Sequence, residues 1–304
     1  MIEAAFRQSV LERQENFSTY KLPKLDDLEL DEVFERIRTA ERIVCPDETR
    51  EAYQVGGATE NNELLVIQGI NPVLLTAEHA TSRIRYFRDE RPSRQDPADQ
   101  GTFGLSWVTR QDTDSSIVAA LGRQTGDANY DIDHPLKEAM RPIICSPEVM
   151  AHLSVHRMFR GRVATPCDEQ AFNIIFGIGD RPSEATKDFI DKAKEVAKKY
   201  DLRSGVNQSV IQFGGDTTPK RNEDGSFKTI ILAAKGPGTT RTFSQAAGES
   251  INRPFIAAQL ELASSILLQP SEHGTRRNFE RQRAGVYLGY LFLRECVSIA
   301  ATKI

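Results

Sequence analysis

The segment Val73-Leu74-Leu75-Thr76-Ala77-Glu78-His79-Ala80 combines a predicted core strand with polar residues at its end. Its apolar run, Val73–Ala77, follows the turn signal Gly69-Ile70-Asn71-Pro72, and a glutamate and a histidine come directly after it. A short apolar run bounded by turn residues predicts a buried β-strand. The glutamate and histidine at its end predict that this strand also carries residues of a functional site.

Further short apolar runs lie on both sides of this stretch. They are Leu64–Ile67, Ile117–Leu121, Leu153–Val155, Phe172–Phe176, Thr229–Ala234 and Phe255–Leu260. Helical patterns separate several of them, most clearly Ser183–Tyr200, where Ser183 can cap the first turn. A last helix is expected from about Arg277 to Ala301. Strands alternating with helices predict an α/β fold, with a mixed, mostly parallel central sheet and helices on both faces.

The first 60 residues are polar and are predicted to be mostly helical. Val33, Phe34, Ile37 and Ala40 follow the spacing of one helix face. We therefore divide the chain into a helical N-terminal extension, residues 1–60, and an α/β domain, residues 61–304. The extension is expected to pack on the main domain.

Composition excludes several classes of protein. The 304 residues include 39 basic and 43 acidic side chains, so no basic surplus favours nucleic-acid binding. We expect no membrane-spanning segment, because Arg294 and Glu295 interrupt the apolar stretch Gly285–Ile299. The four cysteines lie far apart, which argues against a thiolate zinc site and a disulfide framework. The first residues lack the features of a secretory signal, so the expected location is cytoplasmic.

Polar residues gather at the ends of the predicted strands. Glu78 and His79 follow the first strand discussed above, His156 follows another, and Glu261 ends a third. Asp99 opens a helix that comes after the first of these positions. Ligands bind outside the carboxyl ends of the strands in such sheets, so these groups could converge on one point.

The chemistry of these side chains fits metal-assisted hydrolysis. Zinc binds imidazole nitrogen and carboxylate oxygen, and a catalytic zinc site keeps one position open for water. A further carboxylate must then accept the proton of that water and pass it to the leaving nitrogen. Glu261 suits this role because an apolar run precedes it, and burial would raise the pKa of its carboxyl. The spacing alone leaves open that the histidines are structural hydrogen-bonding groups, because no His-Glu-x-x-His motif is present.

Five short elements resemble those of the N-formylglutamate amidohydrolase family, and they occur in the same order. Leu74–Ala80 looks like its Glu-His-Ala or Pro-His-Ala-Gly element, and Gly122–Asn129 looks like its Ser-Arg-x-x-x-Asp-x-Asn element. Asp99-Gln100-Gly101-Thr102 lies upstream of the latter, where the family has an aspartate. Ser154-Val155-His156 takes the place of the second histidine, and Gln259-Leu260-Glu261-Leu262 resembles the Gln-x-Glu element. Together they span roughly residues 64–265.

The resemblance implies a zinc-exopeptidase/phosphorylase-like α/β fold and a role for each matched residue. His79, Asp99 and His156 would bind a divalent metal, which we expect to be zinc. Glu261 would be the general base and acid. These assignments agree with the strand and helix pattern and with the polar residues at the strand ends.

The same resemblance implies that Arg123, Asp127 and Asn129 shape the substrate pocket, with Arg123 or Asn129 holding a carboxylate. Two positions depart from the family pattern. Tyr130 stands where the family has an arginine after the asparagine, and Thr81 stands where it commonly has a glycine. Another arginine could supply the missing cation: Arg123, Arg157, Arg160 or Arg162.

Some of these residues have other interpretations. Asp99 could instead cap a helix, and Glu78 or Asp114 would then replace it as the ligand. His134 and His273 lie in polar surroundings, so we expect them in exposed loops.

The sequence therefore predicts a metal-dependent hydrolase that cleaves an amide bond in a small N-acylated amino acid or a similar carboxylate. One alternative is a non-catalytic relative that binds a ligand or a partner protein. Another is a carboxypeptidase-like enzyme acting on short peptides. The expected partner is a small-molecule substrate, and the sequence leaves the oligomeric state open.

Overall fold

A computed structural model describes residues 27–45, 63–85, 94–96, 98–129, 131, 133–158, 173–179, 181–207, 239–251, 253–268 and 276–302. Several positions singled out above lie outside these ranges: the predicted strand Thr229–Ala234, Arg160, Arg162 and His273.

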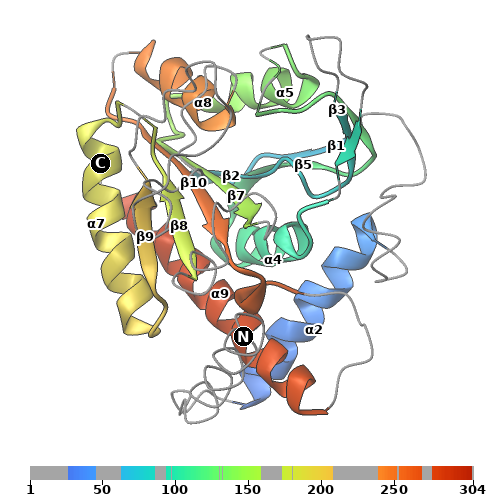
Figure 1. The fold of residues 1–304 in the computed structure, drawn as a ribbon. Coiled ribbons are helices and arrows are strands. Elements are labelled where there is room, and N and C mark those ends of the chain that lie inside the picture. Colours follow the sequence, from blue (N-terminus) through green and yellow to red (C-terminus); the bar gives the residue numbers. More distant parts are fainter. Residues whose placement is uncertain are drawn as a thin grey trace, which may run out of the picture.

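A seven-stranded sheet lies at the centre of the molecule (Figure 1). Its strands are β1 (Leu64–Ile67), β2 (Asn71–Ala77), β5 (Ser115–Ala120), β7 (Ala151–Arg157), β8 (Ile174–Gly177), β9 (Ser204–Asn207) and β10 (Ile256–Leu262). Their order across the sheet is β1-β5-β2-β7-β10-β8-β9. The four middle strands β5, β2, β7 and β10 are parallel, whereas β1 and β8 pair antiparallel with their inner neighbours and β9 runs parallel to β8. The prediction of a mixed, mostly parallel sheet is confirmed.

A second, small sheet lies beside the first. It contains β3 (Arg83–Arg85), β4 (Arg94–Asp96) and β6 (Gln124–Thr125), in the order β4-β3-β6. Strand β3 begins four residues after His79, and β6 leads directly into the segment with Asp127 and Asn129. The small sheet therefore brings together the segments that follow β2 and β5.

Helices cover both faces of the central sheet, as predicted (Figure 1). On one face lie α4 (Thr102–Thr113), α7 (Glu184–Lys199) and α9 (Arg276–Thr302), with α2 (Asp27–Val44) packed outside α4 and α9. On the other face lie α5 (Pro135–Ile144) and α8 (Thr240–Glu249). The positions of α7 and α9 match the predicted helices to within a residue at nearly every end, and the Ser183 side chain accepts a hydrogen bond from the Thr186 backbone N–H, as expected of a cap.

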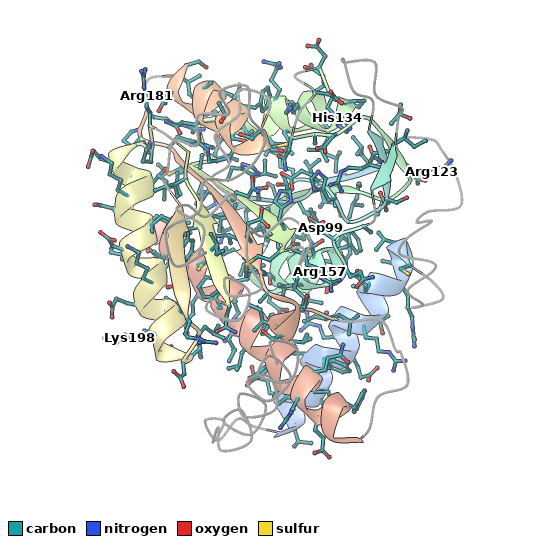
Figure 2. The ribbon with its side chains drawn as sticks, viewed as in Figure 1. Asp99, Arg123, His134, Arg157, Arg181 and Lys198 are labelled. Carbon is teal, nitrogen blue, oxygen red and sulfur yellow. The ribbon has the colours of Figure 1, made fainter. Side chains whose placement is uncertain are left out.

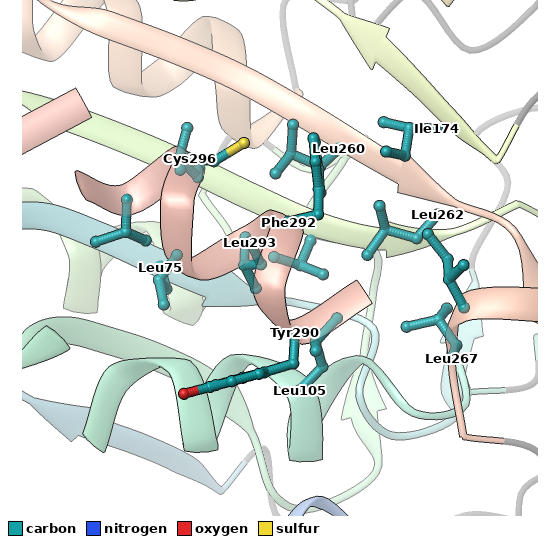
Figure 3. Close-up of a cluster of buried hydrophobic side chains, with 14 of the residues drawn as sticks. Leu75, Leu105, Ile174, Leu260, Leu262, Leu267, Tyr290, Phe292, Leu293 and Cys296 are labelled. Atoms are coloured by element: carbon teal, nitrogen blue, oxygen red, sulfur yellow. The ribbon is translucent and has the colours of Figure 1, made fainter. Parts of the chain in front are cut away.

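The main core lies between the sheet and α9. Phe292, Leu293 and Cys296 of α9 are fully buried and face Leu75 of β2 and Leu260 of β10 (Figure 3). Side chains alternate between the two faces of a strand, so the residues next to Leu75 and Leu260 point to the opposite face. That opposite face is where the polar residues at the strand ends are found.

Helix α2 belongs to the segment predicted as an N-terminal extension. Val33, Phe34 and Ile37 are buried and belong to the same apolar cluster as the residues of α4 and α9. The helix therefore contributes to the core of the α/β domain. The proposed boundary near residue 60 stays a prediction, because residues 46–62 lie outside the described ranges.

Within the described ranges, one helical segment, Phe279–Thr302 of α9, is long and apolar enough to cross a membrane by length and composition. Two thirds of its most apolar window, 67%, is buried inside the protein. Burial of this kind is typical of a core helix.

Candidate metal centre

Three neighbouring parallel strands carry polar side chains on one face of the sheet. In β7 the sequence His152-Leu153-Ser154-Val155-His156 alternates, so His152, Ser154 and His156 share that face. The register pairs Ser154 with Thr76 of β2 and with Gln259 of β10, and it pairs His156 with Glu261. A buried polar strip therefore runs across the sheet towards the carboxyl ends of its strands.

Three side chains meet at the end of this strip. One ligand atom each from His79, Asp99 and His156 lies within 4.8 Å of the other two, and all three residues are buried. Asp99 Oδ2 is 3.1 Å from His156 Nδ1 and 3.5 Å from His79 Nδ1. Figure 2 shows Asp99 inside the molecule, close to α4. The structure thus brings together the three residues predicted as metal ligands.

Local backbone contacts place these groups. His79 follows the end of β2, and its carbonyl oxygen accepts a 2.7 Å hydrogen bond from the Asp99 N–H. The Asp99 carbonyl accepts hydrogen bonds from the hydroxyl and the N–H of Thr102, the first residue of α4. His156 is the second-to-last residue of β7, and it is paired with Glu261 of β10. Two strand ends and one helix start therefore define the cluster.

A carboxylate lies behind His79. The second ring nitrogen, Nε2, is 3.1 Å from Asp127 Oδ1, and Arg83 donates to Asp127 Oδ2 at 3.2 Å. An ionised carboxylate can only accept, so His79 must carry its proton on Nε2 in this pair. The lone pair on Nδ1 then points towards Asp99.

A similar argument fixes the proton of His156. The Ser154 hydroxyl gives its single proton to Glu78 Oε1 at 2.7 Å. It can therefore only accept from His156 Nε2, which is 2.9 Å away, and Glu78 Oε2 lies 3.3 Å from the same nitrogen. His156 is thus protonated on Nε2, and its Nδ1 lone pair also points at Asp99.

The Nδ1 lone pairs of neutral His79 and His156 therefore face the Asp99 carboxylate oxygen. A cation between these three atoms would stabilise the arrangement. Carboxylates behind ligand histidines are the usual arrangement in metal sites, and two imidazoles with a carboxylate suit zinc. Without a metal, a second proton on His156 supplies the charge. Burial lowers the pKa of His156, but the nearby Glu78 and Asp99 carboxylates outweigh it and raise the pKa to about 9. Burial would raise the pKa of Asp99, but the adjacent His156 and His79 rings hold it well below its usual range.

Glu261 lies beside His156 on the adjacent strand and is buried. Burial, with a smaller contribution from the Asp99 charge, raises the pKa of its carboxyl to about 7. Gln259 donates a 2.5 Å hydrogen bond to Glu261 Oε1, which orients the carboxyl group. The desolvation predicted for this residue is confirmed, and its pKa suits proton transfer near neutral pH.

The three residues predicted to bind substrate lie in different surroundings. Asp127 lies behind His79, as described above. Asn129 Nδ2 is 3.5 Å from His156 Nε2, and its Oδ1 accepts hydrogen bonds from the N–H and hydroxyl of Thr240 at the start of α8. Arg123 projects outward near β3, away from Asp99 (Figure 2). Of these three, Asp127 and Asn129 are brought to the cluster, and Arg123 is not.

Of the arginines considered as replacement cations, Arg123 and Arg157 fall within the described ranges, and Arg157 is the one of these two that lies at the cluster. Its N–H donates to Asp99 Oδ2 at 3.3 Å. Its guanidinium donates to the Ser264 hydroxyl at 3.0 Å and to the Gln100 side chain. It is therefore a cation at the edge of the cluster.

Three expectations are corrected. Asp114 cannot replace Asp99, because it lies at the C-terminal end of α4, at the opposite end from the cluster. Asp99 is not the cap of that helix, because Gly101 occupies the N-cap position. His134 is not exposed: its side chain is buried and caps α5 by accepting from the Leu136 N–H at 3.2 Å. The proline that follows it is typical of the first position of a helix, and this signal distinguishes a capping residue from a loop residue.

Several residues that hydrogen-bond around the cluster were not predicted from the sequence to do so. Ser154 and His152 could have been found from the two-residue alternation in β7. Thr76 bridges Glu78 and His152 at 2.8 and 2.7 Å, and the same alternation in β2 places it on the polar face. Arg83 had no local signal, because its partner Asp127 is 44 residues away.

The fold and the cluster define a class: a mixed α/β protein with a candidate metal centre at the carboxyl ends of its parallel strands. No protein-family model matches the chain, and no curated protein sequence matches it. The crystal structure of N-formylglutamate amidohydrolase from Ralstonia eutropha JMP134 is similar over 78% of this chain and 99% of that one, with a TM-score of 0.47 and 11% identity. Purine nucleoside phosphorylase from Toxoplasma gondii in complex with immucillin-H is similar over 75% and 93%, with a TM-score of 0.32 and 10% identity. Similarities at these values do not bear on catalytic function.

Proposed function

We propose that this protein is a metal-dependent amidohydrolase. One observation carries the proposal: the Nδ1 atoms of two buried histidines face a buried aspartate oxygen, and the Nε2 of each histidine is backed by a carboxylate. His79, Asp99 and His156 would hold the ion, which we propose to be zinc. A bound zinc ion would polarise the carbonyl of the scissile amide and lower the pKa of water.

Glu261 is the proposed general base and acid. It accepts a proton from the attacking water and delivers it to the leaving nitrogen, so that the C–N bond breaks as an acid and an amine form. Its burial and its pKa near 7 support this role, because a base with that pKa is partly ionised at neutral pH and can still return the proton. Gln259 orients the carboxyl group through its hydrogen bond to Oε1.

The proposed substrate is a small N-acylated amino acid or a similar carboxylate. Asn129 lies between His156 and the first turn of α8, and Arg157 supplies a cation at the edge of the cluster. Asp127 is better suited to orienting His79 than to contacting the substrate, because both of its oxygens have protein partners. We further propose that the protein acts in the cytoplasm, where thiols such as those of Cys45 and Cys296 stay reduced.

Elemental analysis of the purified protein tests the proposal. We expect about one zinc ion per chain in the native protein. The His79→Ala/His156→Ala double variant should contain none and should lose hydrolysis of N-acyl amino acids. Stoichiometric metal without hydrolysis of any N-acyl amino acid or short peptide would favour the non-catalytic alternative. Hydrolysis of short peptides in preference to N-acyl amino acids would favour the carboxypeptidase-like alternative. Absence of metal even after metal is added back would overturn the proposal.

A further inference from the structure

Helix α4 begins beside the candidate metal centre but lacks a cap of its own. Its N-cap residue is Gly101, which has no side chain, and its first turn contains no acidic residue. The first backbone N–H groups of a helix have no partner within the helix and carry partial positive charge. A buried helix start of this kind needs an acceptor from elsewhere.

Glu41 of α2 supplies that acceptor from 60 residues away. Its Oε1 accepts a 2.7 Å hydrogen bond from the Gly101 N–H, and its Oε2 accepts another of 2.7 Å from the Gly104 N–H. The residue is fully buried. One carboxylate therefore binds two free N–H groups and also places a negative charge at the positive end of the helix.

Both glycines are required by this arrangement. Gly101 has a φ of 81°, a conformation that L side chains rarely adopt, and a Cβ there would lie 2.6 Å from the Leu268 N. A Cβ on Gly104 would lie 2.4 Å from the Ile37 carbonyl oxygen and 3.2 Å from Glu41 Oε2. The close approach of α2 to the start of α4 thus depends on a missing side chain at position 104.

The same helix start holds Asp99. Only Gln100 separates Asp99 from Gly101, and the Thr102 hydroxyl and N–H both donate to the Asp99 carbonyl. Asp99 in turn presents Oδ2 to His79 and His156. A displacement of the first turn of α4 would therefore move the one carboxylate among the three candidate ligands.

We infer that Glu41 is a positioning residue of the metal centre, which holds Asp99 in place through the N-terminus of α4. The inference rests on the proposed function and gives helix α2, in the N-terminal segment, a role in it. Loss of an outer partner of a metal ligand typically weakens metal binding by about ten- to a hundredfold. Glu41 acts one contact further out, so we expect a loss towards the lower end of that range in Glu41→Ala and a smaller loss in Glu41→Gln, whose amide oxygen can still accept one of the two hydrogen bonds.

The test compares zinc affinity by chelator competition in the full-length folded protein, well below its Tm. Glu35→Gln is the matched charge control, because Glu35 is an exposed carboxylate on the same helix. Leu30→Ala is the stability control, because it removes buried apolar volume nearer the other end of α2. Zinc affinity in Glu41→Ala equal to that of a Leu30→Ala protein with a similar loss of Tm would reduce Glu41 to a purely structural residue and overturn the inference.

Hydrogen exchange in the metal-free protein gives a second, independent measurement. We expect the Gly101 and Gly104 amides to exchange faster in Glu41→Gln than in the native protein or in Glu35→Gln. Unchanged exchange at both amides would overturn the inference even if the variant bound zinc weakly. If the native protein binds no zinc, the proposed function and the role assigned to Glu41 both fall, whereas unchanged exchange with normal zinc binding removes only the role of Glu41.

Discussion

His79 and His156 each use both ring nitrogens. In each ring one nitrogen faces Asp99, and the other faces a buried carboxylate, Asp127 or Glu78. Four ionisable groups besides Asp99 are thereby held in fixed orientations. Burying several carboxylates this close together is costly without compensating positive charge, which supports the proposed cation site.

Proton transfer by Glu261 can be separated from metal binding. In Glu261→Gln the amide cannot accept a proton at neutral pH, so turnover should fall by at least about a hundredfold. Zinc content should not change, because Glu261 is not among the three candidate ligands. The measurement is hydrolysis of whichever N-acyl amino acid the native protein cleaves, together with elemental analysis. Glu195→Gln, an exposed change on α7, is the control. Near-native turnover in Glu261→Gln would remove the residue from the mechanism.

Metal binding should depend on pH through His156. In the metal-free protein its pKa is about 9, so below that pH the ring carries an extra proton that a metal on Nδ1 must displace. Apparent zinc affinity should therefore rise by about tenfold per pH unit from pH 7 towards pH 9 and then level off. Calorimetry in buffers of different ionisation enthalpy should detect release of about one proton per zinc at pH 7. Binding without proton release would show that the ring is already neutral.

At the scale of elements, helix α9 makes close contact with the backbone at residues 265 and 266 through two of its glycines. A Cβ on Gly285 would lie 2.0 Å from the Ser265 carbonyl oxygen, and one on Gly289 would lie 2.4 Å from the Ile266 carbonyl oxygen. Alanine is the better helix former, but these carbonyls are backbone atoms that cannot easily move away. Gly285→Ala should therefore destabilise the protein by about 1–3 kcal/mol, measured by urea unfolding. Ser298→Ala, an exposed position on the same helix, should change stability little. A stabilised Gly285→Ala protein would mean that α9 packs less closely.

Local patterns predicted most of these elements. Strand β2 with Glu78 and His79, helix α7 with its serine cap, and the partly desolvated Glu261 all follow from residues adjacent in sequence. The contacts that were missed join distant segments. Glu41 and the start of α4 are 60 residues apart, and no pattern within either helix indicates that one caps the other.

The candidate site likewise has features that local sequence predicts and contacts that depend on distant segments. The two histidines among the candidate ligands were predicted as residues at the ends of strands, and parallel pairing brings those ends together. Their hydrogen-bond partners depend on register, because Ser154 meets Glu78 only when β2 and β7 are aligned as observed. Register between strands whose paired residues, such as Leu74 and His152, are far apart in sequence is set by the whole core and cannot be derived from either strand alone.

For the whole molecule, the metal should act as a stabilising ligand. A ligand present at about a thousand times its Kd stabilises the folded state by about 4 kcal/mol. Removing zinc with a chelator should therefore lower Tm by roughly 5–10 °C for a chain of this size. Scanning calorimetry with and without chelator provides the measurement. The His79→Ala/His156→Ala variant is the control, and its Tm should be the same under both conditions. A native protein equally insensitive to the chelator would show that the cluster holds no metal in solution.

Strand β7 contributes His152, Ser154 and His156 to one face and Leu153 and Val155 to the other. Inserting or deleting one residue before His152 would exchange the two sets, so that leucine and valine faced Asp99 while imidazoles entered the core. Substitutions along this strand affect one contact at a time, but a change of length by one residue affects all of them. Length variation among natural homologues should accordingly be found in the connecting loops, and β7 should keep a constant number of residues.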